Sequence, residues 1–464
     1  MTQALTIDEA ALGKLAQGFR GRLLRPGDSG YDAARTIFNA MIDRRPALIA
    51  QPTDTSDVAS AVNFARENGL LVSVKGGGHA ASGHAVCDDG LMINLSLMKA
   101  ITVDRPSRIA VAEAGVTWGE FDAATQEHGL AVTGGRVPST GIAGLTLGSG
   151  SGWLERKLGY TVDNMIGAEV VTADGDVLRA SEKENPELFW GLRGGGGNYG
   201  IVTKFEYRLH PIGPIIFGGM LIFPRPRAAE VIKAYREFIE VAPDDVGGAI
   251  ALLCAPPEPF VPEPMHGMPI LAVVVCYTGR PEDAEQAIKP ILDLGPVMNM
   301  TQPMPYVELQ RMIEGGNQPG FQNYWKADMY AELPDEAIDT LAAVTAEPIS
   351  TMTAIIVQPI GGAVHRVPDD ATAMGWRSAK WALHILGMWD DPAENEKQIA
   401  WVRNVAAALQ PFAQKGTYLN YLMDEGQRRV EESFGPTFQR MVALKNKYDP
   451  TNFFRLNQNI EPTA

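Results

Sequence analysis

Hydrophobic residues along the first part of this chain recur with two different periods, and each period predicts regular structure. Val58, Val62 and Ala65 share one face of a helix. We expect this helix to end at Gly69, because glycine is common just past a helix C-terminus. The apolar run at 70–74 then predicts a buried strand that leads into a row of glycines.

Two local signals predict the elements that follow. A second strand is expected at 108–116, and Thr117 and Glu120 form a capping box for a helix that ends at Gly129. Residues 167–181 predict a β-hairpin, because two strand-like runs flank an Asp-Gly turn. The first part of the chain is therefore expected to alternate strands with helices.

The pattern changes after about Pro211, where prolines and glycines punctuate the chain. Strand-like runs at 269–277, 350–360 and 381–389 lie between helical segments, which predicts a second domain built on an antiparallel sheet. The tail at 433–448 predicts one amphipathic helix, followed by a proline that blocks its continuation.

Composition narrows the classes of partner. The 464 residues carry 40 basic against 55 acidic side chains, a net charge of −15. Nucleic acid and anionic membranes require clustered positive charge, so we expect neither as a partner. The first residues lack the pattern of a secretory leader, and no apolar run approaches the roughly 18 residues of a spanning helix. We therefore predict a cytoplasmic protein; its oligomeric state is not predicted.

Several common motifs are missing or misplaced. The GxGxxG at 195–200 follows a helix-like segment and precedes a strand, the reverse of the order in a dinucleotide-binding fold. The sequence has no P-loop, and its histidines and cysteines lack zinc-binding spacing, so we predict no metal. Disulfides are not expected, because the three cysteines (Cys87, Cys254 and Cys276) lie far apart.

Glycine is concentrated at 75–84, 134–152 and 194–200, each time beside a predicted strand. Backbone N–H groups in such loops can bind a pyrophosphate, so the three loops could surround one extended ligand. A set of tight turns in a glycine-rich fold explains the same pattern equally well.

These stretches resemble a known family. "VKGGGHAASGH", "GLTLGSGSGWLERKLGYTVDN" and "GGGGNYGIV", with the closing segment "TYLNYLMDEG…RLNQNI", are similar to the berberine-bridge-enzyme-like branch of the vanillyl-alcohol-oxidase superfamily, whose FAD-binding domain is of the PCMH type. The resemblance implies an α+β fold. After an N-terminal segment (1–41), it implies an FAD-binding domain at 42–212, a substrate domain at 213–415, and a C-terminal segment at 416–464 that returns to the FAD domain.

The resemblance also implies how FAD is held. In the family, the histidine of the GGGH turn is joined covalently to the 8α-methyl of FAD, and His79 occupies that position. Doubly linked members carry a cysteine where this chain has Val137, so we predict a single link through His79. Ser151 stands where relatives often have a tyrosine. The other residues implied to contact FAD are Lys75, Gly76, Gly77, Gly78, Ser82, Thr140, Gly141, Gly144, Leu145, Gly148, Asn164, Gly200, Val202, Asn457 and Asn459.

The resemblance places the catalytic groups in the second half of the chain. Tyr421 matches a position where relatives carry an active-site tyrosine or histidine. His384 matches a strand position that faces the flavin, and Gln358 is a further candidate for the substrate pocket. A phenol or an imidazole there can accept a hydroxyl or amine proton while hydride leaves to flavin N5. A core tyrosine and a hydrogen-bonded strand histidine are the alternatives.

The implied function is FAD-dependent oxidation of a C–O or C–N bond in a small molecule. Relatives act on sugars, alkaloid-like amines and secondary-metabolite alcohols, and the expected acceptor is O2, which gives H2O2. Thr140 replaces a residue that influences oxygen access in relatives. Two alternatives stay open: a dehydrogenase of the same fold with another electron acceptor, and a flavin-free binding protein on this scaffold.

Overall fold

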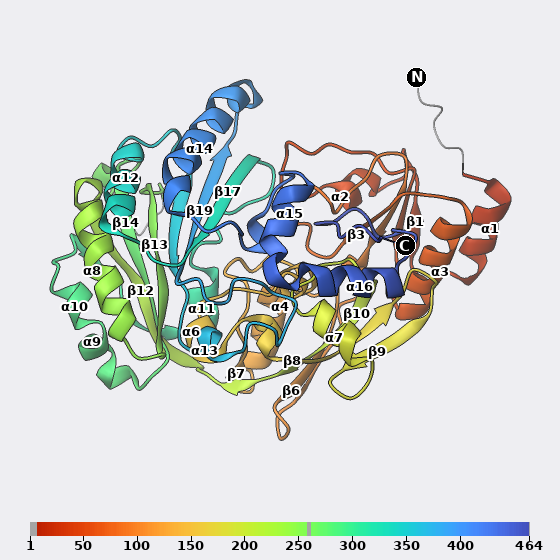
Figure 1. Cartoon of the computed structure of the whole chain (residues 1–464), viewed down its shortest axis with the longest axis horizontal. Coiled ribbons are helices and arrows are strands. Elements are labelled where there is room, and N and C mark those ends of the chain that lie inside the picture. Colours follow the sequence, from red (N-terminus) through yellow and green to blue (C-terminus); the bar gives the residue numbers. More distant parts are fainter. Residues whose placement is uncertain (1–6, 258–260, 464) are drawn as a thin grey trace.

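Four β-sheets organise the residues that the computed structural model describes, 7–257 and 261–463. Three of the sheets are formed by strands β1–β11, and the fourth by β12–β19. Figure 1 shows the two groups side by side, with the large sheet and its helices on the left. The mixed helix and sheet architecture with antiparallel sheets confirms the predicted α+β fold.

The first sheet has the order β1-β2-β4-β3, and its β2, β4 and β3 are parallel. Its strands and neighbouring helices are β1 (Arg22–Leu24), β2 (Leu48–Gln51), β3 (Val72–Lys75), β4 (Leu91–Asn94), α1 (Glu9–Gly18), α2 (Tyr31–Arg35) and α3 (Thr55–Glu67). The predicted helix face is confirmed, because Val58, Val62 and Ala65 are fully buried on α3. β1 pairs with β2, so residues before 42 already contribute to this sheet.

The second sheet is antiparallel, in the order β5-β6-β10-β8-β9. It contains the predicted hairpin, β8 and β9, and the strand expected near 108–116, which is β6. The capping box of Thr117 and Glu120 is present at the start of α4. The bounds in this region are β5 (Ile101–Asp104), β6 (Ile109–Glu113), α4 (Trp118–Gln126), β7 (Leu130–Ala131), α5 (Ile142–Leu147), α6 (Glu155–Leu158), β8 (Met165–Val171), β9 (Val177–Ser181), α7 (Pro186–Leu192), β10 (Ile201–Arg208) and β11 (His210–Pro211).

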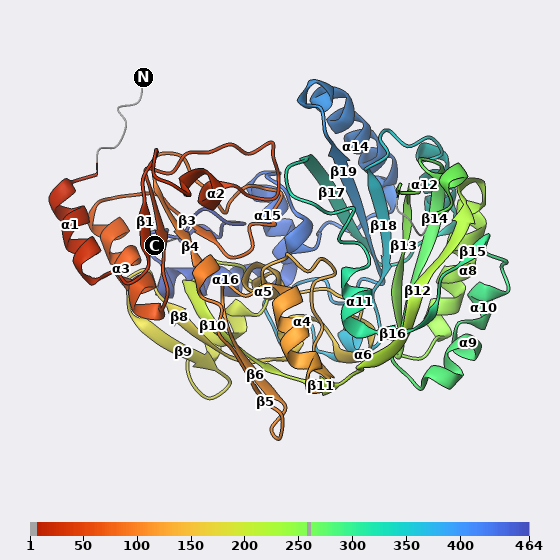
Figure 2. The same cartoon turned by 180° about the vertical axis from the view of Figure 1, so that it is seen from behind.

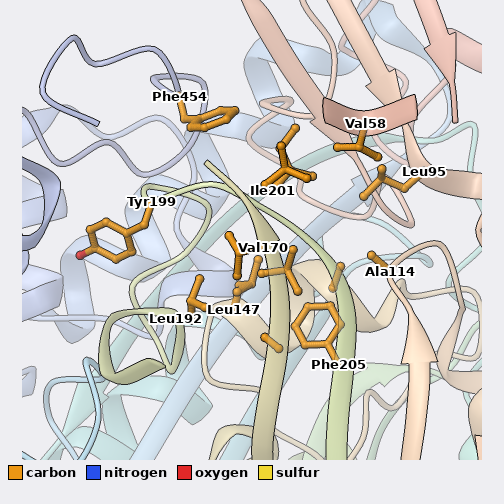
Figure 3. Close-up of a cluster of buried hydrophobic side chains, with 14 of the residues drawn as sticks. Val58, Leu95, Ala114, Leu147, Val170, Leu192, Tyr199, Ile201, Phe205 and Phe454 are labelled. Carbon is orange, nitrogen blue, oxygen red and sulfur yellow. The ribbon is translucent and has the colours of Figure 1, made fainter. Parts of the chain in front are cut away.

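One hydrophobic core joins the first two sheets. Figure 3 shows part of it, where Val58 of α3 and Leu95 lie near Val170 of β8 and Phe205 of β10. β7 and β11 form a small separate pair at the edge of this half. The GxGxxG segment lies between α7 and β10, so the predicted reversed order is confirmed, and the segment is not a dinucleotide-binding fingerprint.

The eight-stranded sheet carries helices on both faces, with α6 and α11 on the inner one. α8, α12 and α14 pack on the face turned away from the other half (Figure 2). The strands predicted at 269–277 and 381–389 are confirmed as β14 and β19. The bounds are β12 (Ile215–Pro224), α8 (Ala228–Val241), β13 (Val246–Cys254), β14 (Pro269–Tyr277), α9 (Ala284–Ala287), α10 (Lys289–Leu292), β15 (Met298–Asn299), β16 (Gln302–Pro305), α11 (Tyr306–Arg311), β17 (Gln322–Tyr330), α12 (Asp335–Val344), β18 (Ala354–Pro359), α13 (Ala363–Arg366), β19 (Trp381–Trp389) and α14 (Asn395–Leu409).

The C-terminal segment lies with the N-terminal half, where the blue α15 and α16 neighbour elements coloured red to yellow in Figure 1. The helix predicted over 433–448 is confirmed only from residue 438 onward. Helix α15 (Gln427–Phe434) ends before Gly435, whose φ is +55°, and α16 (Phe438–Tyr448) begins after Pro436. The left-handed glycine and the missing proline N–H interrupt the helical hydrogen bonds there.

Buried ion pairs tie distant segments to this half. Lys445 Nζ of α16 lies 2.6 Å from Asp449 Oδ2, and it also donates to the carbonyls of Asn198 and Phe454 at 3.0 Å. Arg377 pairs with Asp163 across 214 residues of sequence. In residues 7–257 and 261–463 no helix is long and apolar enough to cross a membrane. The exact domain limits and the cytoplasmic location stay predictions.

Candidate active site

A cavity of about 1620 Å³ lies between the N-terminal half and the inner face of the large sheet. It exceeds the roughly 300–1,000 Å³ of an ordinary ligand pocket, so it has room for a cofactor and a second molecule. All three glycine loops reach it. The lining residues that the sequence had singled out are Gly76, Gly77, Gly78, His79, Ser82, Thr140, Gly141, Gly144, Leu145, Gly148, Gly200, Val202, His384, Tyr421 and Asn457.

The first two glycine loops touch each other through their backbones. A Cβ at Gly77 would lie 2.2 Å from the backbone nitrogen of Gly141, so neither position has room for a side chain. Gly144 and Gly197 differ, because a Cβ at either would meet no atom within 4 Å. Since both line the cavity, their missing side chains leave open space along it. This arrangement favours the extended ligand over a set of tight turns.

His79 lies at the tip of the first loop, packed between polar and aromatic neighbours. Its ring stacks on Phe38 with centroids 4.6 Å apart, and its Nε2 lies 2.9 Å from Ser139 Oγ. Thr140 Oγ1 is 3.5 Å from Nδ1. Burial lowers the pKa of His79 to about 4, because a charged imidazole is poorly solvated there. The ring is therefore neutral near pH 7, the form in which it is a nucleophile.

Asparagines of the C-terminal segment close the cavity beside the third glycine loop. Asn457 Nδ2 donates to the carbonyls of Gly197 and Phe454, at 3.2 and 2.9 Å. Within the described residues, the Oδ1 atoms of Asn457 and Asn459 are buried without a hydrogen-bond partner. A buried acceptor without a donor is costly, so a ligand that donates there would satisfy it.

Four of the expected site residues do not line the cavity. Lys75 Nζ donates to the carbonyls of Ala34 and Thr36, and the side chain of Asn164 bonds to the loop at 158–160. Asn459 follows Asn457 by two residues but does not line the cavity. Gln358 also does not line it, and it accepts a hydrogen bond from Tyr421, which does.

Tyr421 and His384 meet at the other side of the cavity. Tyr421 belongs to a 3₁₀ turn (Leu419–Tyr421), and His384 projects from β19. Their rings stack with centroids 3.8 Å apart at 17°, and Trp325 of β17 meets the His384 ring edge-on. The His384 Nε2 is buried without a partner among the described residues. Burial lowers the pKa of His384 to about 3, so its ring is also neutral.

A buried polar network supports Tyr421. The Tyr421 hydroxyl donates to Gln358 Oε1 at 3.3 Å, and Gln358 Nε2 donates to Glu155 Oε1 at 2.5 Å and to Ser151 Oγ at 2.7 Å. Ser151 Oγ donates to Glu155 Oε2 at 2.6 Å. Arg136 donates to Ser151 Oγ at 3.0 Å.

This network sets the acidity of the phenol. Burial raises the pKa of Tyr421, and the positive charge of Arg136 is the largest influence that lowers it. Sequence reasoning missed Arg136 and Glu155. Arg136 lies in the second glycine loop, and Glu155 follows shortly after it. A charged residue in or next to a glycine-rich loop was the signal that could have identified them. Ser151, noted only as a missing tyrosine, is a member of this network.

Cys87, Cys254 and Cys276 are free and buried. Over the described ranges, no group of three or more His, Cys, Asp or Glu side chains is placed to hold a metal ion.

Comparison with known proteins places this arrangement in a family. Residues 46–181 match a family described as an FAD binding domain, and residues 417–461 match one described as berberine and berberine like. (R)-6-Hydroxynicotine oxidase of Paenarthrobacter nicotinovorans is 31% identical over 459 residues, 96% of this chain and 97% of that protein. An FAD-linked oxidoreductase of Dictyostelium discoideum is 30% identical over 455 residues, 97% of this chain and 96% of that protein.

Solved structures agree. The crystal structure of 6-hydroxy-D-nicotine oxidase from Arthrobacter nicotinovorans superposes with a TM-score of 0.85 at 29% identity, covering 96% of this chain and 98% of that one. The chain belongs to the berberine-bridge-enzyme-like FAD-linked oxidoreductases, and it is an FAD-dependent oxidoreductase. The flavin-free alternative is thereby disfavoured.

Proposed function

We propose that the protein is a covalent flavoprotein that oxidises a C–O or C–N bond of a small molecule and passes the electrons to O2. The observation that carries the proposal is that His79 of the first glycine loop, His384 of the large sheet and Tyr421 of the C-terminal segment line one cavity. A cofactor held at the first site and a substrate held at the second would therefore meet inside it.

The residues that would hold FAD are those of the glycine loops and the C-terminal asparagines. His79 would carry the single covalent link, and Val137 offers no thiol for a second one. Asn457, which lines the cavity, presents a buried acceptor that has no donor among the described residues. The open space at Gly144 lets the ligand pass close to the backbone of α5.

Tyr421 is the residue we assign to proton removal. When bound, FAD would accept hydride from the substrate carbon at N5. The hydroxyl or amine proton of the substrate would pass to the Tyr421 oxygen, so the product is a carbonyl or an imine. Only the phenolate form of Tyr421 can accept this proton; burial raises the pKa of Tyr421 and Arg136 partly offsets that rise, so proton removal would become faster as the pH increases. His384, neutral and stacked on Tyr421, would hold the ring in place and offer Nε2 to the substrate.

The acceptor distinguishes this proposal from its nearest alternative. A dehydrogenase of the same fold would use the same residues for the first half of the reaction. Hydrogen peroxide released in proportion to substrate oxidised would support O2 as acceptor, whereas dye reduction without peroxide would support the dehydrogenase.

The first experiment tests whether flavin is attached covalently, independently of the reaction that the protein catalyses. The purified protein is denatured in acid and run on a gel, and flavin fluorescence is sought in the band at 50.1 kDa. We expect fluorescence in the parent protein and in His84→Ala, and none in His79→Ala. His84 is the matched control, since it lies in the same loop with an equally buried ring whose pKa burial lowers to about 4.

Two results would contradict parts of the proposal. A dark band above a yellow supernatant in the parent protein would retain the flavoprotein and remove the covalent link. Fluorescence that persists in His79→Ala would place the link on another residue, which peptide mapping would then identify.

A further inference from the structure

The His79 ring is held on one face and at its edge. Phe38 stacks on the face, with ring centroids 4.6 Å apart and 22° between the ring planes. The Phe38 N–H donates to the carbonyl of Gly78 at 2.9 Å, so the stacking residue is itself tied to the turn that carries His79. At the edge, Ser139 Oγ lies 2.9 Å from Nε2, and Thr140 Oγ1 lies 3.5 Å from Nδ1. These contacts give the imidazole one orientation.

The two ring nitrogens of His79 have different surroundings. Thr140, which lies beside Nδ1, lines the cavity. Ser139, which lies beside Nε2, is exposed to solvent and does not belong to the cavity lining. Nδ1 is therefore on the cavity side of the ring, where FAD would lie, and Nε2 is turned toward Ser139 and the solvent.

The backbone fixes the position of the Ser139 hydroxyl. The residues on either side of Ser139 are both bonded to the start of α4. The carbonyl of Pro138 accepts from the Gly119 N–H at 2.9 Å, and the carbonyl of Thr140 accepts from the Trp118 N–H at 2.9 Å. Ser139 is thus held between two anchored residues, so its distance from the His79 ring does not depend on a mobile loop.

A hydrogen bond at one nitrogen of a neutral imidazole decides what the other nitrogen can do. Burial lowers the pKa of His79 to about 4, so near pH 7 its ring carries a single N–H. If Nε2 holds that hydrogen and donates it to Ser139 Oγ, the lone pair of Nδ1 faces the cavity. Thr140 Oγ1, at 3.5 Å, is too distant to hold this lone pair in a strong hydrogen bond.

We propose that Ser139 is a positioning residue for the covalent link: its hydroxyl holds His79 as the Nε2–H tautomer and takes up the Nε2 proton while Nδ1 bonds to FAD. The inference rests on the proposed function for the existence of a link through His79. It adds the residue that prepares the histidine and the ring nitrogen that reacts.

Atoms and electrons balance in this step. The new bond joins Nδ1 to the 8α carbon of FAD, and one C–H bond of that methyl group breaks. The two electrons of the broken bond reduce the flavin ring, and O2 then accepts them. One proton comes from the methyl group and one from Nε2, and these are the two hydrogens of the H2O2 that is formed. Because a buried imidazolium is poorly solvated, a hydroxyl at the solvent surface is a suitable group to remove the second proton.

The first test compares Ser139→Thr with Ser139→Val, two variants of nearly equal shape of which only the first has a hydroxyl. The full chain is produced in riboflavin-starved cells, FAD is added in air, and flavin fluorescence of the acid-denatured band is followed over time. We expect Ser139→Thr to form the link at the rate of the parent and Ser139→Val to form it at least about tenfold more slowly.

Total flavin, linked and released together, is measured in the same samples. It should be equal in the parent and both variants, which shows that Ser139→Val folds and binds FAD. Equal rates of link formation in the two variants would overturn the role of Ser139. A parent band without fluorescence would contradict the proposed link itself, so the two failures are distinguishable.

The second test needs no variant. The flavin-bearing peptide is released from the parent holoprotein by proteolysis, and NMR identifies the ring nitrogen that is bonded to the 8α carbon. We expect Nδ1. A bond at Nε2 would overturn the inference and retain the covalent link, because that nitrogen would then have no proton to give to Ser139.

Discussion

At the glycine loops the cavity is lined by backbone, whereas at the large sheet it is lined by side chains. Gly77 and Gly141 approach so closely that no other residue fits, and Gly144 leaves the α5 backbone open to the cavity. On the sheet the strand backbones pair with one another, so mainly inward side chains, such as Met220 and Ala251, face the cavity.

The difference teaches which part of the site can vary. A wall made of backbone suits a ligand whose identity is fixed, such as a cofactor, because any side chain added to that wall fills the space. A wall of alternating side chains can be reshaped by one substitution without disturbing the strands. We therefore expect the two walls to respond differently to the same kind of mutation.

The largest effect should come from adding a methyl group to the backbone wall. In Gly141→Ala the new Cβ would lie 2.2 Å from Gly77 N, so the loops must separate. We expect a loss of about 3 kcal/mol in the free energy of unfolding and little bound flavin. Denaturant unfolding and the flavin-to-protein absorbance ratio measure both.

Gly144→Ala is the matched control. Its Cβ would meet nothing in the protein, and alanine favours the helix by about 1 kcal/mol, so stability should not fall. Only flavin retention should decrease, since the methyl group enters the cavity. Equal stability of the Gly141→Ala protein and its parent would contradict the close contact of the two loops.

The next effect concerns the proton acceptor, Tyr421 of the C-terminal segment. Tyr421→Phe removes the hydroxyl and should slow flavin reduction by about 10²–10⁴-fold, with flavin content unchanged. Stopped-flow absorbance under anaerobic conditions measures this rate. Tyr324→Phe is the control, because that hydroxyl lies outside the cavity and bonds to Arg403. An unchanged rate in Tyr421→Phe would remove the residue from the mechanism.

A smaller effect is expected where the two walls meet. Arg136 belongs to the second glycine loop, and its charge partly offsets the rise that burial causes in the pKa of Tyr421, a residue of the C-terminal segment. Arg136→Met should therefore raise that pKa and move the pH profile of flavin reduction toward alkaline pH. The loss of rate at neutral pH should be smaller than in Tyr421→Phe. Arg136→Lys keeps the charge and should restore the profile, which a purely structural role would not require.

The smallest effect should appear in the pH dependence of stability. Burial lowers the pKa of His84 from 6.5 to about 4, so between these values the unfolded chain binds a proton that the folded one does not. Folding stability is thus lost as the pH falls through this window, by at most about 1.4 kcal/mol per pH unit from this residue. His84→Asn should flatten the slope by that amount, and an unchanged slope in denaturant unfolding at pH 4.5–6.5 would contradict the buried neutral imidazole.

Much of the fold followed from local patterns. The capping box at Thr117, the hairpin after β8, and the bounds of β14 and β19 agree with the sequence because caps, turns and strand alternation act over a few residues. The break between α15 and α16 was also local, since Gly435 and Pro436 are adjacent, but the apolar period continues across it and concealed it.

The sequence by itself determined the cofactor side of this protein. Each glycine loop is a short continuous segment, so its residues and their spacing can be recognised without knowing what they face. On the substrate side the resemblance had named Tyr421, His384 and Gln358, but only the tertiary structure decided how they meet and that Arg136 and Glu155 join them. The network of Tyr421, Gln358, Glu155 and Arg136 joins residues more than 200 positions apart. Such a set arises from strand register and packing, which no short stretch of sequence encodes.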